Sequence, residues 1–191
     1  MGHDRRDAQR NDLEAVTSAS AGSGRPAEAP MRTHPLAPAM LDKILAAGAA
    51  VLLAAVLIAL ARGFGQWAEV PGVIWVHLAT IVIALALTPV MLLRPRGDKL
   101  HRALGWVWAA AMFLTAFVSL FVRVIEPGKF SVIHLLSLWT MLQVPLIVLR
   151  ARQHNWQRHR SAVRGMVIGA LLIAGFFTFP FGRMMGRWLL G

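Results

Sequence analysis

Four histidines recur at similar positions in two successive stretches of the sequence. They are His77 and His101 in the first stretch and His134 and His159 in the second, and the two members of each pair are 24 and 25 residues apart. Neutral imidazole is a common ligand of metal ions and of haem iron. Two histidines on facing helices could hold a haem iron from its two sides, because bundle cores commonly carry such sites.

The sequence around these histidines indicates an internal repeat over residues 73–124 and 130–181. The first copy contains HLATIVIALALTPVMLLRPRGDKLHR, and the second contains HLLSLWTMLQVPLIVLRARQHNWQRHR. Each copy opens with a histidine, has a proline eleven or twelve residues later (Pro89 and Pro145), continues with an Arg-x-Arg and ends with His-Arg. The pattern predicts two similar helical hairpins. A hairpin duplicated for folding alone would give the same pattern, since duplication is common in membrane bundles.

Five apolar segments would place the histidines in a membrane. Hydrophobic residues make up 57% of the 191 residues and charged residues only 15%, whereas a soluble domain has about 25% charged residues. Each segment is near the roughly 20 residues that a helix needs to cross the hydrocarbon core. We therefore predict an all-α, polytopic bundle of five transmembrane helices within a membrane domain over residues 39–191. The predicted helices cover about 41–61, 73–93, 99–124, 130–152 and 160–181.

A local signal in the sequence refines the start of the third predicted helix. Gly97-Asp98 is a helix-start signal, so the third helix is expected to begin near Lys99.

Residues 1–38 are rich in Ala, Ser, Gly, Pro and Arg, and such a segment buries too little apolar surface to offset the entropy of ordering it. We expect them to form a disordered cytoplasmic tail. The first apolar run follows several acidic residues and lies too far from the start for a signal peptide, so cleavage is not expected.

The charge of the loops predicts the orientation of the helices. Residues 94–102 carry four basic residues against one acidic residue, and residues 150–164 carry five basic residues and no acidic one. Because strongly basic loops stay in the cytoplasm, the N-terminus is expected inside and the C-terminus outside. Arg183 and Arg187 near the C-terminus disagree with this orientation, and the two strongly basic loops decide it.

The same composition argues against several functions. The formal net charge is +11, but the basic residues flank apolar spans, so lipid topology explains them and nucleic acid is not an expected partner. The chain has no cysteine, which excludes disulfides, thiolate catalysis and covalently attached c-type haem. All nine acidic residues lie in the tail or near span ends. The spans therefore lack the carboxylates and the catalytic residue set that a carboxylate-based ion pump or a hydrolase would need.

The alternating direction of the helices sorts the histidines into two pairs. His77 and His134 lie about one turn inside the outer ends of their helices, and His101 and His159 lie at the inner starts of theirs. At 1.5 Å per residue, the pairs would be roughly 20–25 Å apart along the membrane normal. The outer pair is a candidate ligand set for one haem b, and the inner pair for a second.

Each of these residues also has another explanation. A single histidine inside a membrane most often bonds to a neighbouring helix, and His77 or His134 could do only that. The two inner histidines lie between basic residues at the headgroup level, where they could contact lipid phosphate instead of iron. Beside them, Arg102 and Arg160 are candidates for contacts with haem propionates or with lipid phosphates.

Three motifs carry a resemblance to a known family. HL near the start of one span, KLHRALGWVW at the start of the next and, after a later histidine, RHRSAVRGM resemble the bacterial predicted membrane proteins catalogued as domain of unknown function 2306. The resemblance covers roughly residues 73–181. It implies a helical multi-pass protein of the bacterial inner membrane and carries no established activity. The four histidines are also similar, in topology alone, to those of the two-haem cytochromes of the b-561 type, which place paired histidines on alternating helices at opposite membrane faces.

These observations support one leading hypothesis and one alternative. The leading hypothesis is a b-type haem protein that passes electrons across the lipid bilayer, as a membrane oxidoreductase or electron carrier. A quinol or a partner oxidoreductase would be its redox partner. The alternative is a cofactor-free membrane protein, either a small transporter or a scaffold subunit of a membrane complex.

Overall fold

The computed structural model describes residues 38–121, 132–180 and 182–191, and within these ranges it contains helices and no strand. The predicted all-α class is confirmed. Residues 1–37 of the predicted tail lie outside the described residues. The elements are α2 (Met40–Arg62), the 3-10 helix η1 (Phe64–Glu69), α3 (Gly72–Leu93), α4 (Lys99–Ser119), α5 (Val132–Arg152), α6 (Trp156–Met166), the π-helical η2 (Val167–Ile173), α7 (Ala174–Phe176) and α8 (Met184–Leu190).

Four of these helices, α2 to α5, are long and apolar enough to cross a membrane. The chain is therefore a multi-pass membrane protein. Helix α4 begins at Lys99, as Gly97-Asp98 predicted, because the Asp98 side chain accepts a hydrogen bond from the backbone N–H of His101. It ends at Ser119. Residues 122–124 of the third predicted span and residues 130–131 of the fourth lie outside the described residues.

The fifth predicted span, residues 160–181, differs from one regular α-helix. The chain is helical without a break from Trp156 to Phe176, so the helix begins and ends earlier than predicted. Its central part, η2, has the wider π-helical turn, and such segments are often found at functional sites. The chain then turns and forms α8, a short helix that no sequence pattern predicted.

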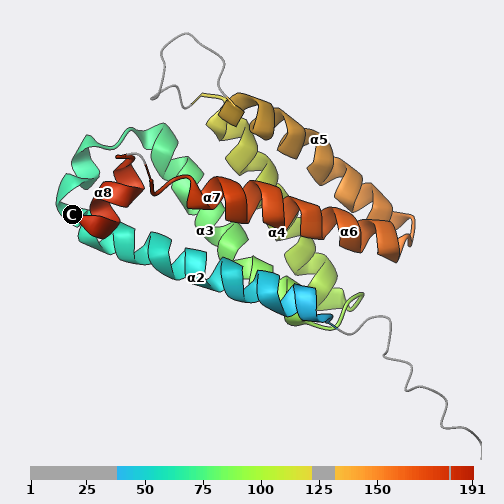
Figure 1. The fold of residues 1–191 in the computed structure, drawn as a ribbon. Helices are drawn as coiled ribbons and strands as arrows, with labels where there is room; N and C mark the ends of the chain where they lie inside the picture. Colours follow the sequence, from blue (N-terminus) through green and yellow to red (C-terminus); the bar gives the residue numbers. More distant parts are fainter. Residues whose placement is uncertain (1–37, 122–131, 181) are drawn as a thin grey trace, which may run out of the picture. The chain divides into compact units, whose positions relative to one another are not determined.

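The long helices form a closed series of neighbours (Figure 1). Helix α2 packs against α3, α3 against α4, α4 against α5 and α5 against α6, and η2 completes the series by packing against α2. Sequential helices run in opposite directions, whereas α2 and α6 begin at the same end. The core between them includes several side chains that are at most 2% exposed: Leu85, Met112, Met166, Val167 and Leu171.

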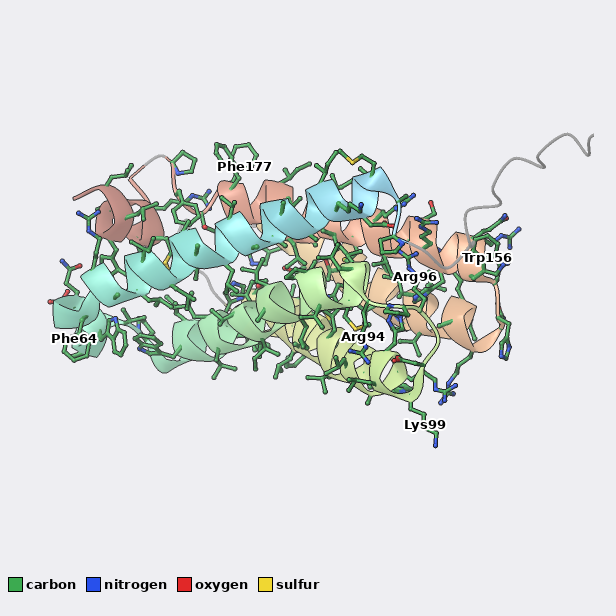
Figure 2. The ribbon with its side chains drawn as sticks, turned by 90° about the horizontal axis from the view of Figure 1, so that it is seen from below. Phe64, Arg94, Arg96, Lys99, Trp156 and Phe177 are labelled. Atoms are coloured by element: carbon green, nitrogen blue, oxygen red, sulfur yellow. The ribbon has the colours of Figure 1, made fainter. Side chains whose placement is uncertain are left out.

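The two ends of this bundle differ chemically. Figure 2 shows Arg96 and Lys99 at one end, where α2, α4 and α6 begin, and Phe64 at the other. We call the first the arginine end. The second is the tryptophan end, because Trp67 and Trp188 pack there with the last turns of α2 and the first turns of α3.

Helix α8 is held at the tryptophan end by Trp188. The Trp188 ring is 6% exposed and packs over Gly63, the residue that ends α2. Its indole N–H donates to Oε1 of Gln66 at 2.8 Å, and the guanidinium of Arg62 donates to the backbone carbonyl of Leu189. A Cβ atom on residue 63 would overlap the indole ring. Docking of α8 therefore requires glycine at this position.

Replacing Gly63 with leucine should detach α8 from α2, because the new side chain would occupy the place of the indole. Since the chain has no cysteine, a spin label on Leu190→Cys, at a position that is 80% exposed, would report the mobility of α8. We expect a clear increase in mobility for Gly63→Leu. Gly65→Leu is the control, because a Cβ atom there meets nothing within 4 Å. Equal mobility in the two variants would contradict the docking role of Gly63.

Candidate functional site

The side chain of His77, on α3, is turned toward α4. Its Nδ1 atom lies 2.9 Å from Oγ of Ser119 and 3.4 Å from the backbone carbonyl oxygen of Thr115. The Ser119 hydroxyl donates its own proton to that carbonyl at 2.8 Å, and a carbonyl oxygen can only accept. A protonated Nδ1 of His77 satisfies both contacts, and in that tautomer the lone pair lies on Nε2.

His77 is one of a series of polar side chains between α3 and α4. The Thr115 hydroxyl donates to Oγ1 of Thr80 at 2.8 Å. Farther along the same interface, the indole N–H of Trp108 donates to Oγ1 of Thr88 at 3.0 Å, and both residues are buried. Such hydrogen bonds hold apolar helices together in a membrane. The interhelical role that the sequence left open for His77 is therefore observed.

His134 lies in the first turns of α5 and is half-buried. Helices α3 and α5, which carry the two predicted outer histidines, both pack against α4. Of this pair, His77 is engaged with α4 through Nδ1. The joint ligation of one iron by His77 and His134 stays a prediction.

The two inner histidines, His101 and His159, both lie at the arginine end. They are in the first turns of α4 and α6. Nδ1 of His159 lies 3.0 Å from the backbone carbonyl oxygen of Ile147 on α5, so Nδ1 donates and Nε2 carries the lone pair. Nδ1 of His101 is buried and has no hydrogen-bond partner within the described part of the chain.

A carboxylate that no sequence pattern singled out organises the same end. Asp42, in the first turn of α2, is completely buried. Its Oδ2 atom accepts hydrogen bonds from Nη2 of Arg96 at 2.7 Å and Nη2 of Arg160 at 2.6 Å, and its Oδ1 atom accepts from Nε of Arg164 at 2.7 Å. The backbone N–H of Ala39 also donates to Oδ2, at 2.9 Å. We call Asp42 and the three arginines the Asp42 cluster.

The Asp42 cluster changes the interpretation of the predicted arginines. Arg160, expected to contact a propionate or a lipid phosphate, has the Asp42 carboxylate as a partner. Arg102 is exposed, and its proposed contact stays a prediction. A signal for Asp42 was present in the sequence, since it is the only acidic residue in the first apolar span. A buried charge without a partner is costly, so this carboxylate required one.

Asp98 shows the contrasting case of an exposed carboxylate at the same end. It accepts a hydrogen bond from the backbone N–H of His101 at 2.6 Å and forms an ion pair with Arg94 at 3.0 Å. These two contacts, the first being the stronger, hold the pKa of Asp98 below its usual value. Because its side chain is 41% exposed, this pair is expected to add little to stability.

Replacing Asp42 with asparagine should destabilise the bundle, because the neighbouring guanidinium groups of Arg160 and Arg164 would lose the carboxylate that both of them bind. Removal of one partner from a buried ion pair typically costs about 3–5 kcal/mol. Asp98→Asn is the control, because asparagine also caps helices and an exposed ion pair contributes little to stability. Unfolding of the purified protein in mixed micelles would measure both losses. Similar losses for the two variants would contradict the role of Asp42.

Comparisons with protein-family models, with curated proteins and with solved structures give no match to this chain. The resemblances to domain of unknown function 2306 and to the b-561-type cytochromes stay predictions. The function must therefore be argued from the chemistry of the residues and from their geometry.

Proposed function

We propose that this membrane protein binds haem b and passes electrons across the bilayer. The observation that carries the proposal is the state of two imidazoles at opposite ends of the bundle. Nδ1 of His159 donates to α5, and in the tautomer in which Nδ1 of His77 donates to α4 both rings offer the lone pair of Nε2. Histidines that ligate a metal almost always donate from their other ring nitrogen, which fixes ring orientation and tautomer.

The inner pair fits an iron site through a second feature. His101 has a buried Nδ1 without a hydrogen-bond partner among the described residues, and a buried ring nitrogen of this kind calls for a partner. Its neighbour His159 is held by a backbone carbonyl and keeps Nε2 for coordination. Haem supplies one-electron redox chemistry when it is bound. In this proposal His101 and His159 hold it near the arginine end, and His77 and His134 hold a second haem near the tryptophan end.

A haem near each end of the bundle would suit electron transfer between the two faces of a membrane. We infer five spans, namely α2 to α5 and the helical run from Trp156 to Phe176, which is close to the roughly 20 residues that a span needs. The basic loops put the arginine end and the N-terminus in the cytoplasm of a bacterial inner membrane. A quinol or a partner oxidoreductase would supply or accept the electrons.

One observation favours the alternative, a cofactor-free transporter or scaffold subunit. The hydrogen bonds of His77 with Ser119 and Thr115 already give it a structural role between α3 and α4. Under this alternative His77→Ala would cost roughly 1 kcal/mol of stability, as is typical of interhelical hydrogen bonds, and there would be no chromophore to lose. Recovery of a stoichiometric partner protein would favour the scaffold version.

The orientation can be tested with single cysteines, because the natural chain has none. Gly65→Cys lies at the tryptophan end and Lys99→Cys at the arginine end, and both positions are exposed. A membrane-impermeant maleimide added to intact spheroplasts should label Gly65→Cys at once and Lys99→Cys only after permeabilisation. The opposite order would reverse the proposed topology.

The haem proposal predicts a Soret band and, after reduction, an α band in protein expressed with ample haem. With two haems bound, His101→Ala and His77→Ala should each remove about half of the absorbance, because each variant loses an axial ligand of one haem. His154→Ala is the control, since His154 is exposed between α5 and α6. A wild-type protein with neither band would refute the proposal, and a spectrum unaffected by His77→Ala or His101→Ala would refute the assigned ligands.

A further inference from the structure

A groove at the arginine end runs beside the starts of α2 and α6. Its volume is about 530 Å³. Its lining combines apolar and polar side chains, among them Leu41, Trp156, Arg160, Ser161, Arg164 and Ile168. The three apolar side chains are each more than one-third exposed. The groove therefore joins an apolar surface to two members of the Asp42 cluster.

The Asp42 cluster carries excess positive charge next to this groove. Arg160 and Arg164 both bind the single Asp42 carboxylate, which Arg96 also contacts, so the positive charge of these two side chains exceeds the one negative charge that they share. Within the described ranges, Asp98 is the only other side-chain carboxylate at this end, and it pairs with Arg94. An anion in the groove would be attracted by the remaining charge.

The same two arginines have hydrogen-bond donors to spare. Nε of Arg160 and Nη2 of Arg164 are buried and have no acceptor among the described residues. A buried N–H group without an acceptor is unfavourable, and phosphate oxygens match the geometry of a guanidinium group. The Ser161 hydroxyl in the groove wall is a further donor. These groups suit a phosphate better than a neutral polar ligand.

We propose that the groove binds an anionic phospholipid, with its phosphate on Arg160 and Arg164 and an acyl chain along Leu41 and Ile168. The charge excess and the exposed apolar residues lie side by side, as phosphate and acyl chain do in a lipid. The proposed orientation puts the groove at the cytoplasmic leaflet, where anionic lipids attract basic residues. The site uses none of the four predicted haem ligands, so this inference is independent of the haem proposal.

Gly165 offers a way to block the groove without altering the Asp42 cluster. It lines the groove, and a Cβ atom at this position meets nothing within 4 Å, so Gly165→Leu would fill the groove and spare the core. Ser161→Trp is a second, independent block at an exposed position. The control is Gly72→Leu, which is equally open but lies at the start of α3, at the tryptophan end.

The test mixes the full-length protein in detergent with equal amounts of phosphatidylglycerol and phosphatidylcholine of the same acyl chains. Bound lipid is then counted by native mass spectrometry. We expect a roughly tenfold preference of the wild-type protein for phosphatidylglycerol, lost in Gly165→Leu and Ser161→Trp and kept in Gly72→Leu. Equal retention of the two lipids by the wild-type protein, or a preference that survives in both groove variants, would overturn the proposal.

Inorganic phosphate, as a third probe, distinguishes binding of a whole phospholipid from binding of a free phosphate. Excess inorganic phosphate is added to the protein loaded with phosphatidylglycerol. The lipid should stay bound, because the apolar wall of the groove holds its acyl chain while phosphate alone has only the arginines. Complete displacement by inorganic phosphate would assign the groove to a free phosphate and overturn the lipid assignment.

Discussion

The buried carboxylate of Asp42 connects parts of the chain that are distant in sequence. Arg96 reaches it from the loop between α3 and α4, and Arg160 and Arg164 reach it from two successive turns of α6. In lipid, apolar surfaces give little preference for one helix partner over another. A charged contact at the helix ends can supply that preference, because leaving any of these groups unpaired would be costly. The cluster thus holds the start of α2 beside α6, where the first and last long helices of the bundle meet.

The two candidate sites at the arginine end follow from the same constraint. Because α4 and α6 both begin at the arginine end, His101 and His159 lie at the same end of the bundle. Because Arg160 and Arg164 share one carboxylate, part of their charge and part of their hydrogen-bonding capacity remain for an anion. The proposed haem site and the proposed lipid site therefore share a structural origin, although they use different residues.

The polar contacts between α3 and α4 affect only the packing of these two neighbouring helices. They are neutral hydrogen bonds, such as that from Trp108 to Thr88, and they fix how two adjacent antiparallel helices pack. For His77 the structural and the proposed functional roles are compatible, because they use different ring atoms. The contact of Nδ1 with Ser119 orients the ring, and in the tautomer in which Nδ1 donates, Nε2 is the nitrogen available to a metal.

Local patterns in the sequence were sufficient to predict the all-α membrane class, four of the five expected spans as helices long and apolar enough to cross a membrane, and the start of α4 at Lys99. These features depend on local composition and on backbone groups that must be satisfied within each helix. The Asp42 cluster, the π-helical turn of η2 and the docking of α8 over Gly63 depend on tertiary contacts and could not be predicted in this way. Asp42 and Arg164 are 122 residues apart, and several arginines compete for this one carboxylate. Only the packing of the helices selects among them, because the strength of each contact depends on distance and burial that no local pattern contains.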